Sequence, residues 1–200
     1  MKGNFMDAIL GNDILCNTKF LQLKQTKSPS GTPWVYAHRP NAKNVVVIAP
    51  VIHSEKGDSL AFIETRRPPV VAEGKAETCI EFPAGLVGDE FQSETTKKAI
   101  KRELLEETGY KADKVKIVAP LVASSPGCTS ETSSIAIVDI LKDKIFKKPV
   151  TDGGVILDIH KVKISKVESW LRAQQKSGKA ISAQTLSALY YVMARIVKLK

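Results

Sequence analysis

Three glutamates within one short segment could hold a divalent metal ion. Glu103, Glu106 and Glu107 follow one another at three- and four-residue spacings. A helix turns by about 100° per residue, so all three side chains share one arc of its surface. Glu103 has no cation three or four residues away, and clustered like charges weaken a helix. A hard dication such as magnesium, which prefers oxygen ligands, would offset this repulsion. The alternative is a solvated acidic face, because glutamate is a good helix former.

The residues around these glutamates favour the metal site. Arg102 stands four residues before Glu106, so it can form an ion pair with Glu106 or orient a neighbouring ligand. Residues 81–88 are typical of a strand end followed by a glycine-containing loop. Gly85 would permit a close backbone approach, so this loop can bring a carbonyl oxygen to a metal. Gly85 and Gly88 as ordinary turn glycines remain the alternative.

The elements that would position these residues are mixed in type. Apolar β-branched runs and turn signals predict strands at residues 13–24, 33–39, 45–51, 59–65, 78–82, 115–122, 134–141 and 155–162. Helices are predicted at residues 94–108, 166–175 and 182–198. The first of them ends at Gly109, a residue suited to the left-handed conformation after a helix. Strands and helices do not alternate strictly, which indicates an α+β fold with a mixed sheet flanked by helices.

The chain is expected to have two parts. Its 200 residues fit one domain of ordinary size with a small additional subdomain. Residues 1–42 are predicted to form a small antiparallel β subdomain, with a turn at 28–33 and a connection at 38–41. Residues 43–200 would form the main domain, which contains the acidic helix.

Composition limits the classes of function. The net charge of +9 suits an anionic partner, but the lysines are spread along the chain, so we expect a solvated surface rather than a nucleic-acid interface. No apolar run approaches the roughly 20 residues of a membrane helix, and the N-terminus lacks a signal-peptide core. We therefore expect no membrane partner and a cytoplasmic location.

The cysteines lack disulfide or zinc spacing and are expected to be buried or half-buried thiols; they are Cys16, Cys79 and Cys128. Isolated histidines with an expected structural role are His38, His53 and His160.

The acidic segment also resembles a known family motif. Gly88, five residues, Glu94, seven residues and the run Arg102-Glu103-Leu104-Leu105-Glu106-Glu107-Thr108-Gly109-Tyr110 match every fixed position of the Nudix box, although Tyr110 is larger than the usual aliphatic end residue. Resemblance to the Nudix hydrolase superfamily implies an α/β/α sandwich and metal-dependent attack of water on a nucleoside diphosphate linked to another moiety. It also implies that magnesium, with manganese as the alternative ion, is held by the Ala84 carbonyl, Glu103, Glu106 and Glu107. Glu106, Glu107 and Arg102 are then expected to take part in catalysis.

Segments outside the box resemble the ADP-ribose and ADP-sugar pyrophosphatase branch. They are the arginine segment 66–69, the loop 80–86 and the proline-bearing loop 124–131, which contains Pro126 and Gly127 as candidate substrate contacts. This resemblance implies hydrolysis of ADP-ribose or a related ADP-sugar to AMP and a sugar phosphate. It also implies a homodimer that exchanges its N-terminal subdomains and holds adenine between aromatic side chains.

Four further residues are candidates for holding such a substrate. Arg39 and Arg67 can make fork-shaped contacts to phosphate oxygens. Trp34 offers a stacking face for adenine and Phe20 could supply another, although the branch often has a tryptophan at the position of Phe20. Packing in a core or dimer interface is the alternative for both aromatics, and a plain surface charge is the alternative for both arginines.

The general base stays open. The branch often has a glutamate in the loop before its last main strand, whereas this chain has no glutamate at residues 151–156. Glu131 and Asp152 are the candidates to orient or deprotonate the attacking water, and a turn-forming role is the alternative for Asp152. Two rival functions also remain. One is hydrolysis of another nucleotide, such as a dinucleoside polyphosphate, NADH or an oxidised nucleotide. The other is a non-catalytic Nudix-fold binder of nucleotide or RNA, which the missing glutamate favours.

Overall fold

The protein contains two separate β-sheets and four helices within the residues that its structure, a computed structural model, describes: 12–88, 93–149 and 155–197. The small antiparallel sheet consists of β1 (Asp13–Asn17), β2 (Gln22–Lys27) and β3 (Pro33–His38). The large mixed sheet consists of β4 (Asn44–Ile52), β5 (Ser59–Thr65), β6 (Cys79–Glu81), β7 (Ala84–Val87), β8 (Lys114–Ala123), β9 (Thr132–Ile140), β10 (Ile156–Lys163) and β11 (Ala180–Ile181). The helices are α1 (Pro68–Ala72), α2 (Thr96–Thr108), α3 (Val167–Lys176) and α4 (Ala183–Val197), and a 3-10 turn (Ile164–Lys166) precedes α3. The predicted α+β class is confirmed.

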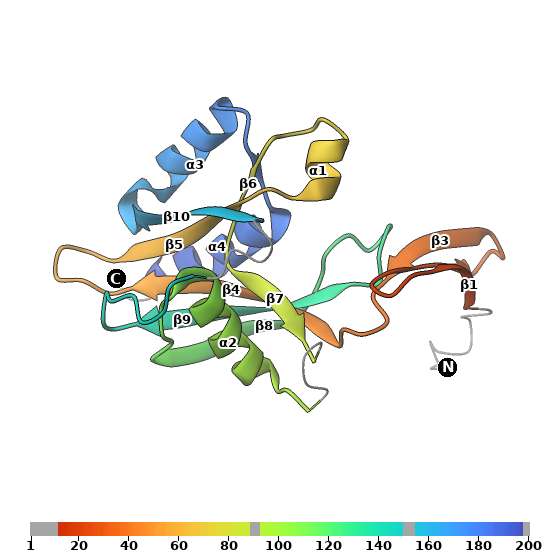
Figure 1. The fold of residues 1–200 in the computed structure, drawn as a ribbon, viewed down its shortest axis with the longest axis horizontal. Coiled ribbons are helices and arrows are strands. Elements are labelled where there is room, and N and C mark those ends of the chain that lie inside the picture. Colours follow the sequence, from red (N-terminus) through yellow and green to blue (C-terminus); the bar gives the residue numbers. More distant parts are fainter. Residues whose placement is uncertain (1–11, 89–92, 150–154, 198–200) are drawn as a thin grey trace.

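Strand β4 lies inside the large sheet, and its side chains alternate between two cores. Val45 and Val47 pack on one face with residues of α3 and α4, whereas Val46 and Ile48 pack on the other face with residues of α2. Successive side chains of a strand point to opposite faces, so a continuous β-branched run fills both cores. Figure 1 shows α2 and α4 on opposite sides of the sheet, which confirms the predicted α/β/α sandwich.

One edge of β4 is shared between two partner strands. β9 runs parallel to β4 over residues 45–52 on one edge. On the opposite edge β7 pairs with residues 44–47 and β5 pairs only with Val51 and Ile52. The Ile48 N–H points to this edge and donates to the Pro83 carbonyl at 2.9 Å. Pro50 lies two residues further on, in the interval between β7 and β5, and has no N–H to donate there.

Helix α2 is fixed at both ends by its local sequence. The Thr95 hydroxyl accepts from the Lys98 N–H at 3.4 Å, which caps the start of the helix. Gly109 ends the helix in the left-handed conformation, with φ of 75°, as predicted. The buried residues Ile100 and Leu104 hold one side of α2 against the sheet. The glutamates therefore stand on a rigid element.

The small sheet lies to one side of the main body and joins it through β3 (Figure 1). The Ala37 N–H donates to the Cys128 carbonyl at 2.9 Å, and the Ser130 N–H donates to the Ala37 carbonyl at 3.1 Å. The Trp34 Nε1–H donates to the Gly127 carbonyl at 3.0 Å. The loop 124–131 is therefore held against the small sheet, and the chain passes to the large sheet through residues 39–43.

The structure differs from the sequence-based expectation at several elements. Residues 13–24 form two strands rather than one, because the chain turns at residues 18–21, where Thr18 hydrogen-bonds to both the N–H and the carbonyl of Leu21. The loop expected after Glu81 contains the strand β7, and the sequence patterns do not predict α1 or β11. All three cysteines are free, but Cys16 and Cys128 are exposed rather than buried. No described helix is both long and apolar enough to cross a membrane.

The histidines have carboxylate or hydroxyl partners, which agrees with the structural role expected for them. His53 lies between Asp58 and Asp139, and His38 lies 2.9 Å from the Ser130 hydroxyl. His160 joins a network on Glu64 of β5 that includes Lys179 and Thr78, whose polar atoms lie 2.7 Å from the carboxylate. Burial raises the pKa of Glu64, but hydrogen bonds from Lys179, Thr78 and His160 outweigh burial and lower this pKa to about 2.

Glu64→Gln is expected to lower the free energy of unfolding by about 2 kcal/mol near pH 7, because these donors stabilise the Glu64 charge only in the folded protein. A depressed carboxyl pKa gives stability that is present above the unfolded pKa and lost as the pH falls towards the folded pKa of about 2. The difference between the variant and the unmodified protein should therefore shrink below about pH 4. Urea titrations at neutral and acidic pH measure it. Glu77→Gln removes an exposed charge nearby and is the control. An equal effect in the control would contradict the prediction.

Candidate functional site

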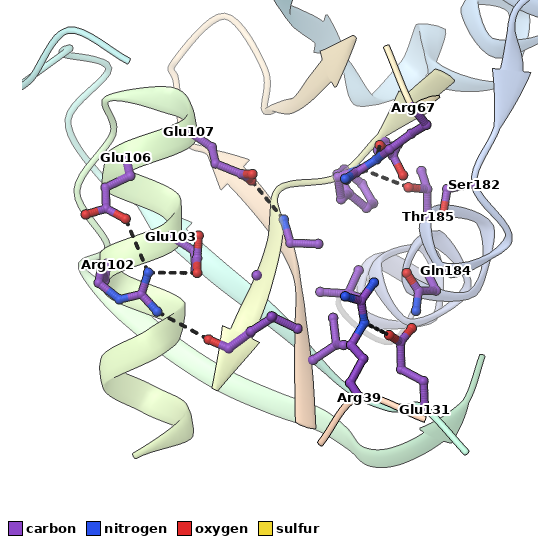
Figure 2. A pocket seen from close by; sticks show the side chains of 17 residues that line it. Arg39, Arg67, Arg102, Glu103, Glu106, Glu107, Glu131, Ser182, Gln184 and Thr185 are labelled. Carbon is purple, nitrogen blue, oxygen red and sulfur yellow. Dashed lines mark hydrogen bonds and ion pairs between the residues drawn. The ribbon is translucent and has the colours of Figure 1, made fainter. Parts of the chain in front are cut away.

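A cavity of about 670 Å³ is lined by residues of α2, β4, β7 and the first turn of α4. The charged side chains of its lining come from five parts of the chain and are Arg39, Arg67, Glu81, Arg102, Glu103, Glu106, Glu107 and Glu131 (Figure 2). Three guanidinium groups and five carboxylates give this lining a formal charge of −2. The cavity therefore repels an anion unless further cations enter with it.

Arg102 is the internal counter-ion of the acidic helix. Its Nε and Nη2 donate to the two oxygens of Glu94 at 3.0 and 3.1 Å, and its Nη1 donates to Glu103 at 2.8 Å and to Glu106 at 3.3 Å. Nη2 also reaches the Leu86 carbonyl at 3.2 Å. The predicted pair between Arg102 and Glu106 is present. The hydrogen bond with Glu94 keeps the pKa of Glu94 below its usual value and that of Arg102 above it.

Glu107 is directed at Ala84, the first residue of β7, rather than at Arg102 (Figure 2). Its Oε2 accepts from the Ala84 N–H at 2.9 Å. Burial raises the pKa of Glu107 to about 8; the Ala84 hydrogen bond and Arg67 act against this rise, whereas the charges of Glu103 and Glu81 add to it. A cation placed beside Glu107 would stabilise its charged form.

The donor set around Glu107 fits a hard dication by its chemistry. Glu103, Glu106, Glu107 and the Ala84 carbonyl offer only oxygen, which magnesium prefers. Within the described residues, no three acidic, histidine or cysteine groups already stand in a metal-coordinating arrangement. Glu103 accepts from Arg102 through Oε1 and Glu107 accepts from the Ala84 N–H through Oε2, and a carboxylate keeps further lone pairs with which it can coordinate a metal ion.

Gly85 leaves the space that the Glu103 carboxylate fills. A Cβ atom at residue 85 would lie 1.9 Å from Cδ of Glu103 and 2.0 Å from its Oε1. The carboxylate of α2 therefore rests directly on the backbone of β7. Sequence analysis assigned Gly85 to a loop that approaches a metal, and the structure places it in a strand against a proposed ligand.

Arg39 and Arg67 are each held by a carboxylate of the cavity. The Arg39 Nε donates to Oε2 of Glu131 at 2.9 Å. The Arg67 Nε donates to Oε2 of Glu81 at 2.7 Å. No residue in the described ranges accepts a hydrogen bond from the Nη groups of either arginine. Both guanidinium groups are thus oriented, and their remaining donors are available to an anion in the cavity.

Other predicted site residues lie outside the cavity lining. Trp34 and Phe20 belong to the small sheet or its β1–β2 turn and are 49% and 70% exposed, so neither is packed in a core. Pro126 and Gly127 also do not line the cavity, and Gly127 instead accepts the Trp34 hydrogen bond. Asp152 lies outside the described residues. The structure therefore brings together the metal and phosphate candidates, but not the adenine candidates.

The cavity also contains residues that sequence analysis missed. Glu81 is held by Arg67 and by the Thr65 hydroxyl at 2.5 Å, and its place at the end of β6, shortly before Ala84, could have indicated it. Gln184 and Thr185 come from the start of α4. Thr185 accepts from the Phe82 N–H at 2.8 Å, across 103 residues of sequence. No local pattern could have indicated a contact that depends on the packing of α4.

Comparison with known proteins gives consistent matches. A model described as the NUDIX domain matches residues 42–181. The chain is 30% identical over 142 residues to a Caenorhabditis elegans protein with the provisional name nudix hydrolase 2. The matched segment covers 66% of this chain and 60% of that relative, which is less than two thirds of the relative's length. It is 25% identical over 163 residues to the ADP-sugar pyrophosphatase of Mus musculus, covering 76% of this chain and 71% of the relative.

Solved structures share the fold. An ADP compounds hydrolase superimposes with a TM-score of 0.63 at 18% identity, over 96% of this chain and 94% of the other. The NUDIX domain of Shewanella oneidensis NrtR, solved with ADP ribose, gives a TM-score of 0.54 at 11% identity, over 76% of this chain and 86% of the other. At such identities the likeness concerns the fold alone.

Gly85→Ala is expected to displace the Glu103 carboxylate, because the new methyl group would occupy its position. Glu103 is the flexible end of a side chain, so the free energy of unfolding should change by no more than about 1 kcal/mol. The affinity for magnesium should fall at least about tenfold. Isothermal titration with magnesium and thermal unfolding measure the two effects. An unchanged magnesium affinity would contradict the role given to Glu103.

Proposed function

Because the chain belongs to the Nudix hydrolase family, we propose that it hydrolyses the diphosphate of ADP-ribose or a related ADP-sugar, with magnesium, to AMP and a sugar phosphate. One observation carries this proposal: a single cavity joins the three glutamates of α2 with two oriented arginines from distant segments. The likeness to the mouse ADP-sugar pyrophosphatase supports the choice of substrate class. The family resemblance inferred from the Nudix box is thereby confirmed.

The charge of the cavity explains why a metal is needed. Its lining has a formal charge of −2 and a diphosphate is itself anionic, so the two would repel each other in a partly enclosed site. Glu103, Glu106, Glu107 and the Ala84 carbonyl would hold the ions. When bound, magnesium neutralises phosphate charge and lowers the pKa of a coordinated water. Manganese has the same ligand preference and is the alternative ion.

The side chains of the protein would then perform separate tasks. Arg102 orients Glu103 and Glu106 through the bonds described above. Arg39 and Arg67 would direct their Nη donors at phosphate oxygens and stabilise the charge that develops there during attack. Glu131 is the candidate for the general base within the described residues. Its Oε2 is bonded to Arg39, so transfer of Arg39 to a phosphate would leave that oxygen able to accept a proton from water.

We also propose that the protein is a homodimer formed through the small sheet. This sheet and its β1–β2 turn expose many large apolar side chains, and an apolar surface that is exposed to water favours association. They are Ile14, Leu15, Phe20, Leu21, Leu23, Trp34 and Val35. A second copy of the chain would cover them and could bring Trp34 and Phe20 to a cavity from which they are separated within one subunit. We also propose a cytoplasmic location, as expected from the sequence.

Magnesium-dependent release of AMP from ADP-ribose is the expected activity. Glu107→Gln should lower kcat by at least about 100-fold, because a neutral amide replaces a charged metal ligand. Chromatographic detection of AMP, with and without magnesium, measures both. Glu168→Gln removes an exposed glutamate of α3 and should leave kcat unchanged. Full activity in the Glu107 variant would remove the acidic helix from the mechanism. A parallel assay with ADP-glucose, NADH and diadenosine polyphosphates separates the rival substrates.

Leu23→Glu is expected to shift the protein from a species of twice the chain mass towards the monomer, because a charge is costly to bury in an apolar interface. Sedimentation velocity at several concentrations measures this shift. Leu141→Glu places the same charge on an exposed apolar residue outside the small sheet and should leave the mass unchanged. A monomeric unmodified protein would reject the dimer without affecting the proposed chemistry.

A further inference from the structure

Gln184 is a cavity residue that the proposed mechanism does not use. It is the second residue of α4 and lines the cavity beside Glu131 and Arg39, on the side away from α2 (Figure 2). Its Nε2 donates to the hydroxyl of Ser124 at 2.9 Å and to that of Ser133 at 2.8 Å. These two bonds use both protons of the amide nitrogen.

The orientation of the Gln184 amide is fixed by the hydrogen bond that Ser124 donates to Glu131. The Ser124 hydroxyl donates to Oε1 of Glu131 at 3.1 Å, and Oε2 of the same carboxylate forms the ion pair with Arg39. An ionised carboxylate only accepts hydrogen bonds, so the single hydroxyl proton of Ser124 is committed to Glu131. The Ser124 oxygen can then only accept from Gln184. The amide must therefore present its nitrogen to the serines and its carbonyl oxygen elsewhere.

The carbonyl oxygen of Gln184 has no protein donor among the described residues. Within the described ranges, Thr26 Oγ1 is a buried side-chain polar atom without a hydrogen-bond partner. Oε1 of Gln184 is not such an atom, so it is not fully buried. Oε1 is therefore accessible, and Gln184 is a lining residue of the cavity. A neutral acceptor fixed in this way repels phosphate oxygens and attracts a hydroxyl or an amine.

We propose that Gln184 is a specificity-determining residue whose Oε1 accepts a hydrogen bond from a hydroxyl of the sugar attached to the ADP moiety. The inference rests on the proposed function, because that function supplies the substrate. Sugar hydroxyls and the adenine amine are the donors that an ADP-sugar offers. The adenine candidates Trp34 and Phe20 do not line the cavity, whereas the metal and phosphate candidates do. Within one subunit the cavity therefore holds the diphosphate and a sugar beside it, and Gln184 is assigned to the terminal sugar.

The test compares hydroxyl preference in the unmodified protein and in Gln184→Met, which has a similar size and no acceptor oxygen. The substrates are ADP-ribose, its analogues that lack the 2- or the 3-hydroxyl of the terminal ribose, and IDP-ribose, which lacks the adenine amine. We expect the unmodified protein to lose about tenfold in kcat/KM on removal of one terminal hydroxyl. Gln184→Met should treat ADP-ribose and that analogue alike. Gln184→Leu repeats the test if the Met variant is unstable.

Ser133→Ala is the matched control, because it removes one partner of Nε2 and leaves Oε1 in place. It should keep the hydroxyl preference of the unmodified protein. A uniform loss of kcat/KM for all substrates in Gln184→Met would mean that Gln184 only supports the loop 124–131, and would overturn the proposal. A preference that changes only with IDP-ribose would overturn the assignment to the sugar. If the unmodified protein releases no AMP from ADP-ribose, both the role of Gln184 and the proposed function are overturned. If AMP is released and the Gln184 variants keep the hydroxyl preference, only the role of Gln184 is overturned.

Discussion

Repulsion among carboxylates on one buried face of α2 is the constraint on which the site depends. A single guanidinium, that of Arg102, bonds to Glu103 and Glu106 of this helix and to Glu94 before it, whereas Glu107 is bonded to the Ala84 N–H. The helix tolerates this arrangement because Ile100 and Leu104, on the adjoining side of α2, are packed in the core. Packing thus keeps the carboxylates partly buried although burying their charge is costly. Their remaining negative charge can bind a dication.

The sequence predicted the parts of this arrangement that local rules determine. The three glutamates on one helix, the end of that helix at Gly109 and the buried strand β4 follow from helical spacing, a helix-end rule and an apolar run, and their places agree with expectation. The break within residues 13–24 was not predictable from apolar content, because a hydroxyl of Thr18 makes the turn. Gln184 required knowledge of which distant segments meet, whereas the position of Glu81 close before Ala84 was a local signal that was not used. The aromatic candidates were placed by resemblance, and within one subunit they stay apart from the cavity.

The cavity is assembled from segments that also support one another. β3 holds the loop 124–131 by backbone hydrogen bonds, this loop carries Glu131, and Glu131 orients Arg39 at the end of the small sheet. Ser124 of the same loop connects Glu131 to Gln184 on α4. One polar network therefore ties the N-terminal sheet to the last helix across the mouth of the site. Such a network is stiff only while every member is bonded, so loss of one partner affects the others.

The divided edge of β4 has a consequence for how the chain reaches this fold. β4 and β5 are neighbours in sequence, and a hairpin between them could close along its whole length before later strands arrive. Pro50 denies that hairpin a backbone donor at the third rung, so pairing stops after Val51 and Ile52. The remaining length stays open for β7, which follows about 30 residues later and brings Gly85 against Glu103. A single imino acid thus reserves the place on which the chemistry depends.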